Sequence, residues 1–413
     1  MPFIFIIVNY ISKKKQVFGA MERGEEDTSW GTVYYAISLF VLSLLAYLFK
    51  ERIILYSGIL IMAYGDGLAA LIGEKYGKKD QFLGIKGKSF AGSLTVAIAA
   101  LIVSFACIKV FTDLSIPAIL FISIMAALFS SLVELVSLNG IDNITLPISS
   151  SIFIAVSIHA ASTGYFVYLV AIALILGFAF AKDKLTLNGV ATAFMTGALI
   201  YGFGGLWLGL ALIAFFVLGT VITKFKSKDK EEAKEEKASN PRNWTQVIAN
   251  SLPAVILAFI YHLTGNKDIL MIAFAVFAAA SSDTFASELG TKTNSTVRSL
   301  ATLKEVPKGL SGGVTIPGFV FSLIGSFLLA LLSVPQFGTR GLLINTILGF
   351  LGAIIDSLLG ATLQKKYLNE EGHLQDDPEY KGQEIAKGLE YVSNSMVNLI
   401  TLSVVAVLGF LWI

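Results

Sequence analysis

Asp66 is an ionisable side chain inside an apolar stretch of the chain, and a lysine-rich segment follows it. A charged group within a membrane span costs about 2.5–3.5 kcal/mol, so it normally has a function or a partner. The next apolar stretch begins with small residues, whose backbone N–H groups at a helix start can hold an anion. The candidate phosphate-binding residues of this cluster are Lys86, Lys88, Ser89 and Gly92.

A similar arrangement recurs around Asp283, again with a basic segment and then a glycine-rich run. Its candidate phosphate-binding residues are Lys304, Lys308, Gly309, Ser311, Gly312 and Gly313. Mg²⁺ takes one or two carboxylates and keeps waters and substrate phosphates as its other ligands. The candidate metal ligands are Asp66, Glu134, Asp142, Asp283 and Asp356. Two such clusters indicate phosphoryl transfer, in which catalysis is positioning and charge neutralisation.

Other interpretations of these residues stay open. Each acid could reach the membrane interface or pair with a loop lysine, and the glycine runs could serve ordinary helix packing. Asn394 and Asn398, one helical turn apart, favour a hydrogen bond between helices. The three histidines and single cysteine show no metal-binding spacing. A net charge of +2 is too small to indicate nucleic-acid binding.

The elements that must position these side chains are membrane helices. Hydrophobic residues make up 55% of the chain, charged residues 15%, and the mean hydropathy is +0.74, whereas soluble domains carry roughly 25% charged residues. The sequence predicts an all-α, polytopic integral membrane helix bundle with about thirteen spans of sufficient length. They are expected at 31–49, 53–72, 90–111, 116–138, 147–162, 164–181, 187–203, 205–223, 244–262, 269–286, 313–333, 341–363 and 390–412.

The basic loops predict the orientation of these helices, because lysine and arginine in short loops mark the cytoplasmic side. Loops 73–88 and 289–310 are the most basic, which places both clusters at the cytoplasmic face, the N-terminus inside and the C-terminus outside. Segment 224–243 reads as a charged, solvated linker. It is expected to separate a first membrane domain, 1–223, from a second, 244–413.

Two family resemblances rest on these motifs. Gly65–Ala70 with Gly87–Ser93 resembles the phytol kinase and dolichol kinase family, related to phosphatidate cytidylyltransferases, although the family's upstream helices are expected to be missing. The second half resembles the DUF92 family, which includes the plant phytyl-phosphate kinase. The residues that carry this second resemblance are Asp283-Thr284, Ser287–Gly290, Val306-Pro307, Gly309, Gly312-Gly313, Asp356-Ser357 and Gly360–Gln364. Where DUF92 proteins favour Gly-Thr-Asn-Gly-Gly, this chain has Gly309-Leu310-Ser311-Gly312-Gly313.

The resemblances imply a membrane kinase with Mg²⁺ that transfers phosphate from CTP or ATP. The acceptor would be a prenol such as phytol, or a prenyl monophosphate that becomes a diphosphate, with its apolar tail in the bilayer. Asp66, Asp283 and Glu288 would be the catalytic residues. A lipid-linked cytidylyltransferase and a non-enzymatic transporter or scaffold are the alternatives. A transporter would place polar residues near the bilayer midplane.

Overall fold

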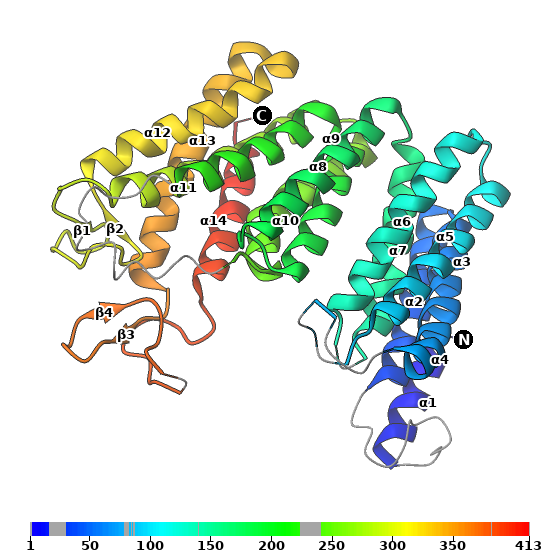
Figure 1. Ribbon diagram of the computed structural model, residues 1–413. Helices are drawn as coiled ribbons and strands as arrows, with labels where there is room; N and C mark the ends of the chain where they lie inside the picture. The colour runs from blue at the N-terminus through cyan, green and yellow to red at the C-terminus, as the bar shows by residue number, and fades with distance from the viewer. Residues whose placement is uncertain are drawn as a thin grey trace. The chain divides into compact units, whose positions relative to one another are not determined.

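The computed structural model describes residues 2–15, 30–77, 82–83, 85, 87–138, 140–223, 241–380 and 382–412. Two compact units divide the chain, Met1–Val167 and Tyr168–Ile413, with the boundary inside helix α8 (Thr163–Ala181). The predicted all-α class is confirmed, since the described ranges hold helices and four strands of two residues each (Figure 1). The division differs from the predicted one at 224–243, because α9 (Leu187–Ile222) packs against α10 (Trp244–Thr264) and α11 (Lys267–Gly290) within unit 2.

Unit 1 is a bundle whose helices pack mainly in pairs, α5 with α6 and α3 with α7. Leu42, Ile54 and Ala155 form a buried cluster between α2, α3 and α7. A segment of π-helix, η2, joins α3 to α4, so that Arg52–Tyr76 continues as one apolar stretch. The elements are α1 (Pro2–Lys15), α2 (Gly31–Phe49), α3 (Arg52–Leu60), η2 (Ile61–Asp66), α4 (Gly67–Tyr76), α5 (Phe90–Phe111), α6 (Ile116–Val136) and α7 (Asp142–His159).

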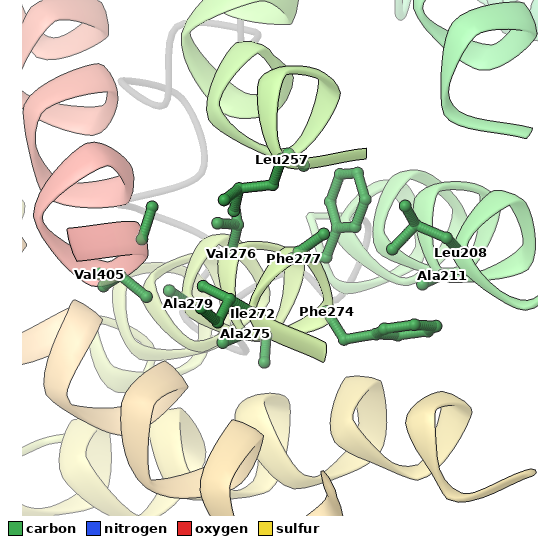
Figure 2. Close-up of a cluster of buried hydrophobic side chains, with 14 of the residues drawn as sticks. Leu208, Ala211, Leu257, Ile272, Phe274, Ala275, Val276, Phe277, Ala279 and Val405 are labelled. Atoms are coloured by element: carbon green, nitrogen blue, oxygen red, sulfur yellow. The ribbon is translucent and has the colours of Figure 1, made fainter. Parts of the chain in front are cut away.

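Unit 2 is built around α11, whose apolar window is 83% buried, far more than that of any other span found among the described residues. A helix that is apolar on all sides belongs in a bundle interior. Figure 2 shows its side chains meeting Leu208 and Ala211 of α9, Leu257 of α10 and Val405 of α14. Besides α8 to α11, unit 2 contains β1 (Arg298–Ser299), β2 (Gly313–Val314), α12 (Ile316–Ala330), η4 (Leu331–Ser333), α13 (Val334–Thr362), β3 (Tyr367–Leu368), β4 (Leu374–Gln375) and α14 (Asn394–Gly409).

Helix α9 is a hairpin of two helical segments that reverses at Gly205, where φ is +79°. A Cβ on Gly189 would lie 2.5 Å from the Arg242 carbonyl oxygen, and one on Gly219 would lie 3.4 Å from its guanidinium. A straight helix would separate these two glycines by about 45 Å. The two predicted spans 187–203 and 205–223 therefore correspond to the two arms of α9.

Helices α12 and α13 form a second hairpin, with a non-helical residue, Gly338, at φ +60°. Asp268 at the start of α11 pairs with Arg340 at 3.3 Å, and the rings of Phe203 and His262 are 5.2 Å apart. These contacts bring the turns after α10 and around Gly205 and Gly338 to one end of unit 2.

Nine helices among the described residues are long and apolar enough to cross a membrane, and α14 is a shorter apolar helix. Two of the nine, Leu187–Ile222 and Ile316–Thr362, contain the reversals at Gly205 and Gly338. Each predicted range overlaps a helix of the structure. The exact number of membrane crossings and the side that faces the cytoplasm stay predictions.

Candidate functional site

Unit 1 contains a cavity of about 440 Å³ that collects most of the first predicted cluster. Helices η2 and α4, the start of α5, the end of α6 and the start of α7 supply its walls. Gly73 and Glu74, which the sequence did not single out, also line it. The predicted residues that it brings together are Asp66, Lys88, Ser89, Gly92, Glu134 and Asp142. Lys86 lies outside the described residues.

Lys88 pairs with two of the acids that line this cavity. Its ammonium donates to Glu134 at 2.6 Å and to Asp142 at 3.4 Å. Glu134 is only 7% exposed, so its charge needs such a partner. Ser89 is the N-cap of α5 and accepts the N–H of Gly92 at 3.1 Å. In this arrangement a bound cation at Glu134 and Asp142 would have to displace the ammonium group.

Asp66 is the last residue of the π-helical segment η2. Extra residues of this kind inside α-helices occur frequently at functional sites, because they turn a side chain away from the regular helix face. Here the carboxylate lines the same cavity as Lys88.

In unit 2, Asp283 of α11 and Asp356 of α13 lie within hydrogen-bonding distance of each other. Given the rise per residue of an α-helix, each lies about 10 Å from the C-terminal end of its helix. Small residues allow this approach, since a Cβ on Gly349 or Gly352 of α13 would clash with Ala278 or Ala279 of α11. Two carboxyl groups so close must share a proton or a cation.

Asp356 is held by the last helix as well. The Thr401 hydroxyl donates to its Oδ2 at 3.2 Å. Asn398 reaches Asn250 of α10 at 3.3 Å, and rotating its amide places the nitrogen 3.3 Å from Asp356 Oδ2. Either orientation links α14 to a neighbouring helix, which confirms the predicted interhelical hydrogen bond.

The glycine loop, residues Gly309–Gly313, lies beside this acid pair. Gly309 and Gly312 have φ of +85° and +84°, and Gly313 pairs with Ser299 across β1 and β2. The loop, the first turn of α12 and both acids line a cavity of about 210 Å³, here called the loop cavity. None of its lining residues, all within the described part of the chain, is a lysine or arginine.

Ser311 anchors the glycine loop to the segment after α13. Its N–H donates to Asp376 at 2.8 Å, its hydroxyl accepts from Gln364 at 3.0 Å, and its carbonyl accepts from Lys366 at 2.5 Å. Lys366 is 1% exposed, and burial lowers its pKa while Asp376 acts in the opposite direction. The Ser311 N–H is thus used within the chain, as are those of Leu310 and Gly313, which donate to the carbonyls of Pro307 and Leu310.

A second cavity of about 220 Å³, here called the arginine cavity, also has Asp283 in its wall. Apolar side chains of α8 and α9 form much of it, and Arg242, Glu288 and Asn394 add polar groups. Asp283, Ser287 and Asn394 line both cavities. The sequence did not single out Arg242, which closes a segment read as a solvated linker.

Two predicted phosphate ligands lie elsewhere. Lys304 and Lys308 are exposed, and neither lines the loop cavity or the arginine cavity. Within the described residues no group of three or more histidine, cysteine, aspartate or glutamate side chains could hold a metal ion. The pair Asp283–Asp356 still fits Mg²⁺, because this ion needs only one or two carboxylates when phosphates and waters complete its shell.

Comparison with known proteins places this arrangement in a family. Residues 170–406, nearly all of unit 2, match the family described as integral membrane protein DUF92. An uncharacterized membrane protein of Methanocaldococcus jannaschii is 31% identical over 188 residues, 45% of this chain and 78% of the relative. The chloroplastic protein VTE6 of Arabidopsis thaliana is 27% identical over 248 residues, 57% of this chain and 68% of the relative. A phytol kinase of Synechocystis is 34% identical over 125 residues, 30% of this chain and 53% of that kinase.

No solved structure is significantly similar to this chain. The apolar helices and the family match define a multi-pass integral membrane protein. The chain belongs to the DUF92 family.

Proposed function

We propose that this protein is a membrane kinase that transfers the terminal phosphate of CTP or ATP to an isoprenoid acceptor. The observation that carries the proposal is the pair Asp283–Asp356, which lines the loop cavity beside the glycine loop, while Asp283 also lines the partly apolar arginine cavity. A kinase that acts on a lipid needs two kinds of surface, one that binds the polyphosphate of the nucleotide and one that binds the lipid. The phytol kinase among the relatives supports this assignment.

The chain's own groups would act mainly by binding and positioning. The start of α12, which lines the loop cavity, would turn the positive end of its helix dipole toward the donor phosphates. Asp283 and Asp356 would hold Mg²⁺, which neutralises charge on the transferred phosphate when it is bound. Thr401 and Asn398 keep Asp356 oriented toward Asp283. Glu288 is proposed to act at the acceptor side, where it lines the arginine cavity.

Unit 1 is proposed to carry a first phosphorylation, from prenol to prenyl monophosphate. Its cavity joins Asp66, the proposed catalytic and metal-binding acid, to Lys88 and to the start of α5. Lys88 paired with two acids would be released to bind phosphate when a metal ion occupies the carboxylates. Unit 2 would then add the second phosphate.

Labelled nucleotides test the proposal. Purified full-length protein receives Mg²⁺, phytol or phytyl monophosphate, and CTP or ATP labelled at either the α- or the γ-phosphate. The γ-label is expected in the lipid product, and the α-label is expected in a released nucleoside diphosphate. Transfer of the α-label to lipid with release of pyrophosphate would establish a cytidylyltransferase instead, and labelling from neither position would reject both enzymes.

Variants assign the two steps. Asp66→Asn is expected to block formation of phytyl monophosphate from phytol and to leave the second step intact. Asp283→Asn is expected to do the reverse. If each variant retained both steps, the assignment of the two units would be wrong.

A further inference from the structure

Backbone hydrogen bonds fix the position of Arg242. Its N–H donates to the Lys184 carbonyl at 3.1 Å, and its own carbonyl accepts the N–H of Thr186 at 3.0 Å. It directly precedes Asn243, whose side chain caps α10 with a capping box. Arg242 is therefore pinned between the α8–α9 connection and the start of α10, although it ends a charged segment.

The guanidinium of Arg242 points along α9 into the arginine cavity. It lies 5.9 Å from the Phe216 ring centre and beside Gly219, where a Cβ would be 3.4 Å from Nη2. Burial lowers the pKa of Arg242, and the Glu288 carboxylate opposes this shift. An arginine side chain stays protonated under such conditions, so the cavity wall carries a fixed planar cation.

One part of this cavity's wall is apolar, while Asp283, Glu288 and several amide and hydroxyl side chains form another part. Ile172 and Leu176 of α8 and Ile213 of α9 line the apolar part together with phenylalanine side chains. A site that joins a lipid-like wall to one arginine is complementary to an amphiphile with an anionic head, because guanidinium binds phosphate oxygens in a bidentate manner. The loop cavity is lined by the glycine loop, the start of α12 and the two acids, with no lysine or arginine among its described lining residues, which suits a polyphosphate that arrives with its own magnesium ion.

We infer that the arginine cavity binds the acceptor as an isoprenoid monophosphate, with its phosphate on Arg242 and its tail along α8 and α9. This inference rests on the proposed kinase function and assigns the loop cavity to the nucleotide. Asp283 lies on the wall that both cavities share, so the two phosphates meet there. Arg242 is a specificity residue that distinguishes a phosphorylated acceptor from a free alcohol.

Phosphate transfer to a monophosphate acceptor needs no general base. A phosphate monoester has a second pKa near 6, so its dianion dominates at neutral pH. One of its oxygens bonds to the γ-phosphorus, while the bond from that phosphorus to the β,γ-bridging oxygen breaks and the nucleoside diphosphate leaves with its electron pair. An alcohol acceptor would have to lose a proton, whereas the monophosphate has none to lose.

Direct binding tests the inference separately from turnover. Dissociation constants for phytyl monophosphate, phytol and CTP are measured on the full chain in detergent, for wild type, Arg242→Gln and Arg242→Lys. Arg340→Gln is the control, because Arg340 is 59% exposed and pairs with Asp268 at the opposite end of unit 2. Arg242→Gln is expected to weaken phytyl monophosphate binding about 10- to 150-fold, the range for lost hydrogen bonds to charged groups. Phytol and CTP binding should stay within about twofold, since they make no such bond.

The outcomes separate the two claims. If Arg242→Gln weakened phytol and phytyl monophosphate equally, or neither, the inference would be overturned. Arg242→Lys, which keeps the positive charge but loses the fork of donors, is expected to lie between wild type and Arg242→Gln even where the glutamine variant folds poorly. If the variants bind as expected but the protein transfers no phosphate, the acceptor site stands and the kinase function is rejected. If the protein transfers phosphate and Arg242→Gln leaves the KM for the acceptor unchanged, the kinase function stands and the acceptor site is rejected.

Discussion

Replacing Gly312 by alanine is expected to disturb the glycine loop more than the same change at Gly309. Both glycines have nearly the same left-handed φ, +84° and +85°. They differ in their surroundings, because a Cβ on Gly312 would lie 2.3 Å from the Ala361 nitrogen and 2.5 Å from its Cα, whereas a Cβ on Gly309 would meet nothing within 4 Å. Gly309→Ala is thus a control that isolates the backbone conformation.

The magnitude follows from these two observations. A left-handed conformation costs a non-glycine residue about 1–2 kcal/mol, and this applies to both variants. The contact with Ala361 is to backbone, which cannot rotate away, and overpacking of this kind costs about a further 1–3 kcal/mol. A domain of 150–250 residues loses about 2–4 °C of Tm per kcal/mol. Gly312→Ala is therefore expected to unfold about 2–12 °C below Gly309→Ala.

The assay is thermal unfolding of both purified variants in the same detergent, followed by CTP and phytyl monophosphate binding. Gly312→Ala is expected to weaken nucleotide binding selectively, because it displaces the glycine loop that lines the loop cavity. Equal unfolding temperatures for the two variants would refute the close approach to Ala361. Loss of phytyl monophosphate binding alone would refute the assignment of the loop to the nucleotide.

Further predictions concern packing and charge. Lys88→Met is expected to destabilise the protein by about 3–5 kcal/mol, because it leaves buried acids without their cation. Adding Glu134→Gln should recover part of the lost Tm. An unchanged Tm in Lys88→Met would contradict the ion pair. Gly349→Ala is expected to cost about 1–3 kcal/mol, since its Cβ would contact Ser326 closely, while Gly177→Ala in open space should be neutral or stabilising. Thermal unfolding checks both, and equal effects of the two alanines would contradict the tight helix contact.

The sequence predicted the helices well, because a membrane span needs a long apolar run and a carboxylate inside one stands out. Asp66, Lys88 and Glu134 could be grouped in advance, since each lies at the same predicted end of neighbouring helices, and the structure brings them to one cavity. Asp283 and Asp356 could likewise be expected on one face. Their direct contact depends on how α11 and α13 cross, and the local sequence pattern does not determine that crossing.

Other parts of the site depended on contacts between distant segments. Lys304 and Lys308 have the right charge, but a basic loop does not reveal which way its side chains point, and both are exposed. Ser311 meets Lys366 and Asp376 across more than fifty positions. Arg242 looked like the end of a solvated charge run. Only the hairpin of α9 shows that it folds back into the bundle.

The central claim is that the acid pair of unit 2 supports phosphoryl transfer. The most direct test measures transfer of γ-labelled phosphate from CTP or ATP to phytyl monophosphate by Asp283→Asn, with Asp268→Asn as the control. Asp268 lies on the same helix, is 40% exposed and pairs with Arg340 at the opposite end. Asp283→Asn is expected to lower the rate about a hundredfold or more, while Asp268→Asn retains it and both proteins keep their unfolding temperature within a few degrees. A folded Asp283→Asn protein with wild-type transfer would contradict the account.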